Sequence, residues 1–253
     1  MAQSKPGGVQ SVTRALDILE AIDAAGGEQA LIEIAAASGL PTPTIHRLVR
    51  TLVDRGYLRQ LPDRRYALGS RLIPLGSSAL TAFGSRSTPE LRRLVSELGE
   101  TANLATLDGD QVVYVGQVPS PHAMRMFTDL GRHVHAHPRA TGKALLSQLS
   151  DDQVRAVLRR AGMPAFTSRT ITSPEELLAQ LAVVRERGWA VDEGELEDGV
   201  VCLAVPVPSA TALLAVSISG PAVRVDERVR ARAVPLLTQV AADLATQLDV
   251  ASA

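Results

Sequence analysis

Apolar residues recur with helical spacing through the first sixty residues of the chain. A first helix is predicted over 12–25, and Gly26 with Gly27 ends it. Its predicted apolar face consists of Val12, Ala15, Leu16, Leu19 and Ile22. A shorter helix is predicted over 31–37, because Gly39 suits the left-handed conformation that closes a helix and Pro41 opposes its continuation.

The next stretch, SGLPTPTIHRLVRTLVDRGYL, predicts a third helix that is both amphipathic and basic. Thr42 is expected to cap it, with Pro43 in the first turn and Gly56 at its end. The inward stripe comprises Ile45, Leu48, Val49 and Leu52, which leaves Thr44, His46, Arg47 and Arg50 on the outer face. A strand at 57–59, a turn at 61–63 and a return strand at 65–68 predict a hairpin directly after this helix.

Charge is distributed unevenly along the chain. The net formal charge of the 253 residues is −1, yet the window 41–71 contains seven arginines and only Asp54 and Asp63 as acids. A local basic patch on an otherwise acidic chain indicates a polyanionic partner for that patch. Three helices followed by a basic hairpin predict a winged helix-turn-helix that binds double-stranded DNA. The candidate DNA contacts are Thr42, Pro43, Thr44, His46, Arg47 and Arg50 on the helix, with Arg64 and Arg65 in the wing. A protein-interaction domain with solvated arginines remains the alternative.

The rest of the chain mixes helices with short strands. A connecting helix is predicted over 70–83, and its apolar residues Leu72, Ile73, Leu75, Leu80 and Phe83 predict a homodimer or a dimer of dimers. Strands are predicted at 104–107, 112–117, 124–127, 202–207 and 213–218, and helices from 87, at 140–148, 151–161, 174–187 and 226–248. This order predicts an α+β fold with a mostly antiparallel sheet.

Composition excludes several classes of protein. The single cysteine, Cys202, allows no internal disulfide, and no apolar run is long enough to suggest a membrane span. The first ten residues lack the apolar core of a secretory signal. A cytoplasmic protein is therefore expected.

Two further patterns raise the question of catalysis or metal binding. His133, His135 and His137 alternate, so on a strand they would share one face with metal-ligand spacing, although a polar strand edge with ordinary histidines is the more usual outcome. An acidic run, Asp192, Glu193, Glu195, Glu197 and Asp198, would complete such a site in a metal-dependent sensor or enzyme, although a solvated loop is the more usual outcome for such a run. RATGKA lacks the first glycine and the hydroxyl residue of a phosphate-binding loop, and no catalytic triad is evident. No catalytic residue, metal or cofactor is predicted.

The chain resembles the IclR-type transcriptional regulators over nearly its full length. The matching stretches, in order, are SVTRALDILEAI, SGLPTPTIHRLVRTLVDRGYL, RRYALGSRL, LDGDQVVYVGQV, ATGKALL, RTITSPEEL, ERGWAVDEGELEDGVVCLAVPV and VSISGP. The resemblance implies a winged helix-turn-helix domain at 1–69, a linker helix at 70–87 and a GAF-like effector-binding domain at 88–253. It also implies dimers, often paired into tetramers, on palindromic operators.

The resemblance further implies an effector site between the sheet and the loop before the GKA helix. Carried over position by position, its residues are Met126, Val134, Ala140, Thr141, Asp192, Cys202, Ser217 and Ser219. The chain departs from the family pattern in HPRATGKA, where Pro138 and Arg139 replace residues of the usual loop. A helix N-terminus and Arg139 both favour an anion, so we expect a small organic acid with its carboxylate toward Ala140–Gly142, Ser217 and Ser219. A neutral ligand, with Arg139 pointing to solvent, remains the alternative.

Overall fold

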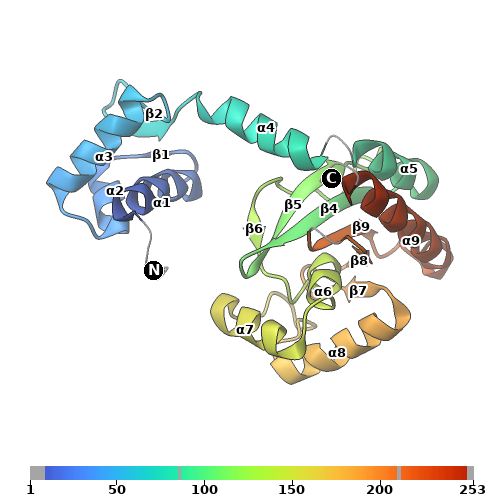
Figure 1. Cartoon of the computed structure of the whole chain (residues 1–253). Helices are drawn as coiled ribbons and strands as arrows, with labels where there is room; N and C mark the ends of the chain where they lie inside the picture. The colour runs from blue at the N-terminus through green and yellow to red at the C-terminus, as the bar shows by residue number, and fades with distance from the viewer. Residues whose placement is uncertain (1–8, 85–86, 210–211, 250–253) are drawn as a thin grey trace. The chain divides into compact units, whose positions relative to one another are not determined.

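The protein divides into two compact units, Met1–Ala79 and Leu80–Ala253. The computed structural model describes residues 9–84, 87–209 and 212–249 (Figure 1). The division falls inside helix α4 (Leu72–Gly84), the segment that the sequence predicts as a linker helix.

The N-terminal unit consists of three helices and a small sheet. Its elements are α1 (Gln10–Ala24), β1 (Glu28–Gln29), α2 (Leu31–Ser38), α3 (Thr42–Asp54), β2 (Leu58–Gln60) and β3 (Tyr66–Leu68). The strands are antiparallel in the order β1-β3-β2. Ile18, Ile22, Ile34 and Ile45 are fully buried and form the centre of the core. The predicted order of helices and hairpin is confirmed, and β1 is an addition that the sequence pattern did not predict.

Two details of the N-terminal prediction are wrong. Val12 and Leu16 are 56% and 52% exposed, whereas Ile18, which the predicted face omitted, is buried. Val12 and Leu16 lie at one edge of an apolar band whose centre is Ile18 and Ile22. Helical spacing alone does not tell which edge of such a band packs against the core. Thr42 is the first residue of α3 and Pro41 takes the cap position.

The C-terminal unit is built on a six-stranded antiparallel sheet of order β6-β5-β4-β9-β8-β7. The strands are β4 (Thr101–Asp108), β5 (Gln111–Val118), β6 (His133–Val134), β7 (Ala190–Glu193), β8 (Val200–Val207) and β9 (Leu214–Pro221). Helices α5 (Thr88–Leu98) and α9 (Glu227–Asp249) cover one face, and α6 (Ala140–Leu146), α7 (Asp151–Ala161) and α8 (Pro174–Arg187) lie on the other (Figure 1). The predicted α+β fold is confirmed.

The two faces of this sheet carry side chains of different size. Successive residues of a strand point to opposite faces, so β8 directs Val201, Leu203 and Val205 into the core beneath α5 and α9. The alternate residues Cys202 and Ala204 face the helices α6–α8, together with Ala215 of β9. Small side chains at these positions let α6 pack closely against β8 and β9.

One predicted strand is absent. Residues 124–127 lie in the loop between β5 and β6 and form no strand. At that edge of the sheet, β5 pairs with the two residues of β6, at Val112–Val134 and Val113–His133. By contrast, α7 and α8 have the predicted bounds, because each begins at a serine that accepts a backbone hydrogen bond from the first turn.

Candidate DNA-binding helix and ligand cavity

Helix α3 presents a basic outer face. It follows α2 across a short turn in which Gly39 adopts φ 63°, the left-handed conformation predicted for that position. Ile45, Val49 and Leu52 are buried, and Pro43, His46, Arg47 and Arg50 are exposed, with Thr44 half-buried. The Thr42 side chain lies outside the described residues. The Arg50 guanidinium is 4.0 Å from Asp54, but both groups are exposed, so this pair costs little to break.

The two arginines of the wing differ in their surroundings. Arg64 is exposed at the hairpin tip with φ 68°, an unusual value for a residue other than glycine. Arg65 is half-buried, and its Nη2 donates a hydrogen bond to the Glu28 carbonyl oxygen at 3.1 Å. Arg65 therefore ties the wing to β1, and Arg64 is the wing arginine left free to meet a polyanion.

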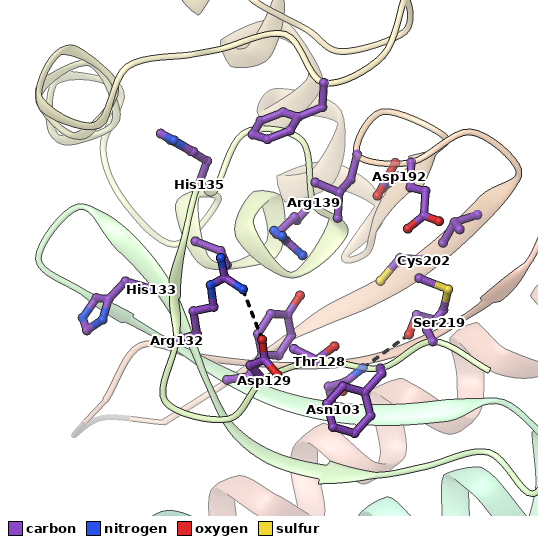
Figure 2. Close-up of a pocket in the computed structure, with 18 residues that line it drawn as sticks. Asn103, Thr128, Asp129, Arg132, His133, His135, Arg139, Asp192, Cys202 and Ser219 are labelled. Atoms are coloured by element: carbon purple, nitrogen blue, oxygen red, sulfur yellow. Dashed lines mark hydrogen bonds and ion pairs between the residues drawn. The ribbon is translucent and has the colours of Figure 1, made fainter. Parts of the chain in front are cut away.

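A cavity of about 510 Å³ lies on the α6 face of the C-terminal sheet (Figure 2). This volume is in the range of small-molecule sites. Its lining residues are Asn103, Tyr114, Met126, Phe127, Thr128, Asp129, Arg132, His133, Val134, His135, Arg139, Phe166, Asp192, Leu196, Glu197, Val200, Cys202 and Ser219. Figure 2 shows Arg139, Asp192, Cys202 and Ser219 around one hollow.

Five of the eight residues carried over by resemblance line this cavity: Met126, Val134, Asp192, Cys202 and Ser219. Ala140, Thr141 and Ser217 are fully buried and are not among its lining residues. Ala140 and Thr141 are covered because α6 packs tightly: a Cβ added to Gly142 would lie 2.0 Å from the Ala136 carbonyl oxygen. The Thr141 hydroxyl is hydrogen-bonded to Tyr114 Oη at 3.1 Å. Ala140, Thr141 and Ser217 therefore do not reach the surface of this cavity, and the placement of a carboxylate beside them stays a prediction.

Sequence reasoning missed a polar cluster on the cavity wall. Asn103 Nδ2 donates to Ser219 Oγ at 3.5 Å, and Gln117 Nε2 donates to Asn103 Oδ1 at 2.9 Å. Asn103 is 1% exposed. An amide in the middle of the apolar run ANLAT was the available signal, because a buried amide requires partners.

Arg139 supplies a cation to the cavity. It is half-buried at the residue preceding α6, and its Cζ is 5.9 Å from the centre of the Tyr114 ring. Its Nε is buried without a hydrogen-bond partner, and no acid of the described chain pairs with its guanidinium. A cation of this kind in a cavity with aromatic walls favours an anionic group on a bound molecule.

Comparison with known proteins identifies both units. Residues 11–62 match the IclR helix-turn-helix domain, and residues 82–246 match the C-terminal domain of the bacterial transcriptional regulator IclR. The transcriptional repressor IclR of Escherichia coli strain K12 is 39% identical over 231 residues, which cover 88% of this chain and 84% of that protein. The chain belongs to the IclR family.

Solved IclR structures share the fold. The IclR regulator from Alicyclobacillus acidocaldarius superimposes with a TM-score of 0.84 at 31% identity, covering 95% of this chain and 99% of the other. An IclR homologue from Microbacterium hydrocarbonoxydans, in complex with 4-hydroxybenzoate, gives a TM-score of 0.80 at 25% identity, covering 95% and 99%. As a member of the IclR family, the protein is a ligand-responsive, DNA-binding transcriptional regulator. No helix in the described parts of the chain is long and apolar enough to cross a membrane.

The composition of the acidic run suggested a solvated loop, but two of its five acids are buried. Asp192 and Glu195 are only 3% and 7% exposed, while Glu193, Glu197 and Asp198 face solvent. Glu195 Oε1 pairs with Nζ of Lys143, a lysine of α6 with no exposed surface, and that Nζ also donates to the Val191 carbonyl oxygen at 3.2 Å. The buried lysine compensates the charge of Glu195, and no local sequence pattern predicts this pairing because 52 residues separate the partners.

Three groups on the cavity wall, Tyr114, Asp192 and Cys202, have raised pKa values, and burial is the main cause in each. Burial raises the pKa of the Asp192 carboxyl to about 6, with Glu195 adding to the rise and the backbone N–H of Glu195 opposing it. Burial, and then the charge of Asp192, raise the pKa of the Cys202 thiol to about 12. Cys202 is therefore a protonated, packed thiol at neutral pH, as its place in an apolar strand predicted.

Asp192→Asn is expected to gain stability over the wild type as the pH rises. The Asp192 pKa is higher in the folded chain than its ordinary value of 3.8, so ionisation above pH 4 costs the folded state more than the unfolded one. Between pH 4.5 and 7.5 the difference in the free energy of unfolding should move by about 2 kcal/mol in favour of the variant. Urea titrations followed by the fluorescence of Trp189, the single tryptophan, measure it. A difference that stays constant with pH would contradict the assigned environment of Asp192.

The three alternating histidines do not share one face. The strand β6 ends at Val134, so His135 and His137 leave the sheet. His133 is paired with Asp108 at 2.9 Å, His135 lines the cavity, and His137 is buried with its Nε2 donating to the Pro164 carbonyl oxygen at 3.0 Å. Within residues 9–84, 87–209 and 212–249, no group of three His, Cys, Asp or Glu side chains is placed to hold a metal ion. The single-face arrangement that a metal site on this strand would need does not form.

Proposed function

We propose that this regulator binds a palindromic operator as a homodimer and changes its DNA affinity when a small organic acid enters the cavity of its C-terminal unit. The observation that carries the effector class is Arg139, a cation in the cavity without an acidic partner among the described residues. Tyr114, Phe127 and Phe166 supply aromatic walls around it. The relative that is similar in structure and holds 4-hydroxybenzoate supports an acid of this type.

The acid is expected to lie with its carboxylate toward Arg139 and Ser219 rather than toward the buried start of α6. A hydrogen bond to a charged partner contributes about 1.5–3 kcal/mol, so Arg139→Gln should weaken acid binding by about tenfold to hundredfold. Calorimetric titration of aromatic and short-chain acids against their amides, in the wild type, Arg139→Gln and Ser219→Ala, measures this effect. Equal binding of acid and amide in all three proteins would overturn the organic-acid effector and leave the DNA-binding function intact.

A second copy of the chain is the proposed partner of exposed apolar residues near the N-terminus. Val12 and Leu16 of α1 and Ile73 and Leu75 of α4 are each more than half exposed, an unusual number for helices that meet only water. The side chains of Leu80 and Phe83, which the sequence placed on the same linker, lie outside the described residues.

Light scattering is expected to give at least a dimer at micromolar concentration. Leu16→Glu combined with Leu75→Glu should shift the equilibrium toward monomer, because burying two carboxylates in an apolar contact is costly. Val223→Glu, at an 89% exposed position of the C-terminal unit, is the control. A wild-type chain that is monomeric under these conditions would rule out the dimer.

A further inference from the structure

Asp192 and Arg139 place opposite charges on the wall of one cavity. Asp192 belongs to the edge strand β7 and is paired in register with Cys202 of β8. Both residues line the cavity, as does Arg139 (Figure 2). The Cys202 thiol responds to both charges, since Asp192 raises its pKa and Arg139 lowers it, so all three groups lie within electrostatic range of one another.

Lys143 contacts the residue before Asp192 and the residue that donates a hydrogen bond to its carboxylate. Asp192 Oδ1 accepts a hydrogen bond from the Glu195 backbone N–H at 2.7 Å. The Glu195 carboxylate pairs with Lys143 Nζ, and the same Nζ donates to the carbonyl oxygen of Val191, the residue before Asp192. Lys143 and Glu195 do not line the cavity, so they act on a bound molecule only through Asp192 and its neighbours.

An ionised carboxylate can only accept hydrogen bonds. An acid whose carboxylate meets Arg139 will bring its other polar groups toward the remaining wall, where Asp192 is held. A carbonyl, ether or second carboxylate there would present lone pairs to Asp192, whereas a hydroxyl or ammonium group would donate to it. A ligand without a donor would leave the buried Asp192 carboxylate without a hydrogen bond, and such a loss discriminates strongly between ligands that differ by one donor.

We propose that Asp192 selects acids that carry a hydrogen-bond donor, a hydroxyl or an ammonium group, and that Lys143 is its positioning residue. This inference rests on the organic-acid effector proposed above and specifies the second polar group that the acid must carry. Arg139 provides affinity for any carboxylate, and Asp192 separates hydroxy or amino acids from keto, methoxy and unsubstituted ones.

Protonation sets the range in which this selection operates. The ionisable groups around Asp192 are Lys143 of α6, Glu195 of its own loop, Cys202 of β8 and Arg139, with Glu197 also on the cavity wall. With a pKa of about 6, Asp192 is mainly ionised at pH 7.5. Below pH 5 it is protonated and can itself donate, so the preference for donor-bearing ligands should shrink there.

Matched ligands test the proposal by calorimetry on the full chain. The aromatic series is 4-hydroxybenzoate, 4-methoxybenzoate, benzoate and 4-(aminomethyl)benzoate, and the short series is lactate, pyruvate and alanine. In at least one series the donor-bearing acid should bind about tenfold to hundredfold more tightly at pH 7.5 than its partners without a donor. Comparing the hydroxyl with the ammonium member shows which donor is preferred.

Asp192→Asn should abolish this preference while still binding carboxylates through Arg139. An amide both donates and accepts, so the hydroxy and methoxy acids should then bind within about threefold of each other. If the wild type binds both equally, or if the preference survives in Asp192→Asn, the proposal is overturned although the acid site stands. If no acid of either series binds the wild type at millimolar concentration, the acid site and this inference fail together.

The positioning role is tested separately from stability. Lys143→Met combined with Glu195→Gln removes both buried charges, which preserves folding better than the single change. The preference for the donor-bearing acid should fall to that of Asp192→Asn, whereas a purely structural lysine would leave the preference unchanged and shift only the thermal melting curve. Lys143→Arg, which keeps the charge, should retain part of the preference.

Discussion

Replacing Arg47 and Arg50 together by alanine is expected to weaken operator binding by at least about 30-fold. Both side chains lie on the exposed face of α3, opposite the buried Ile45, Val49 and Leu52, and a helix in this position of a helix-turn-helix lies in the major groove. Each lost base contact costs about 1–3 kcal/mol. A gel-shift titration on the DNA upstream of the protein's own gene measures the change, with circular dichroism to verify folding.

The wing provides an internal comparison. Arg64→Ala should lower the salt dependence of binding by about one unit of slope, because an exposed arginine at the tip can neutralise one phosphate. Arg65→Ala should leave that slope nearly unchanged and lower the melting temperature, because its guanidinium is bonded to Glu28. Arg159→Ala, an exposed arginine of α7, is the charge control. Wild-type affinity in the Arg47 and Arg50 double variant would mean that another surface contacts DNA.

Lys143→Met is expected to be the most destabilising single change in the C-terminal unit. Lys143 has no exposed surface and pairs with Glu195, whose Oε2 is buried without a hydrogen-bond partner. Removing one member of a buried pair leaves an uncompensated charge and costs about 3–5 kcal/mol. Urea unfolding followed by Trp189 fluorescence reports this unit alone, because the N-terminal unit contains no tryptophan.

A double-mutant cycle separates the charge from the packing. Glu195→Gln in the Lys143→Met background should recover much of the lost stability, since both ionised groups are then absent. Equal instability of the single and double variants would attribute the loss to packing around the lysine stem.

The sequence predicted the DNA-binding helix more completely than the ligand site. The α3 stripe Ile45, Val49 and Leu52 alternates with Arg47 and Arg50 within one helical segment, so spacing alone separates the inner from the outer face. Helical spacing could not predict the role of Arg65, because its partner Glu28 lies 37 residues away on a two-residue strand. Contacts of that kind are set by how β1 pairs with β3, which no local pattern encodes.

The residues of the ligand site were likewise predicted only in part, because tertiary packing decides which of them reach the cavity. Resemblance placed Asp192, Cys202 and Ser219 at the cavity, but it also placed Ala140, Thr141 and Ser217 there, where close packing of α6 covers them. Asn103 and Tyr114 line the cavity only because β4 pairs with both β5 and β9 in the folded sheet, which brings their side chains to the same wall as Ser219.

The sequence by itself determined the helices, the four long strands of the C-terminal sheet and the basic face of α3, because these follow from the period of apolar residues and from capping and turn residues. Only the tertiary structure decided which polar groups meet. Glu195 of the acidic run forms a buried pair with Lys143 because α6 packs against β7, and the alternating histidines separated because β6 ends at Val134. Charges distant along the chain interact through space, and their energies depend on burial that the sequence alone does not specify.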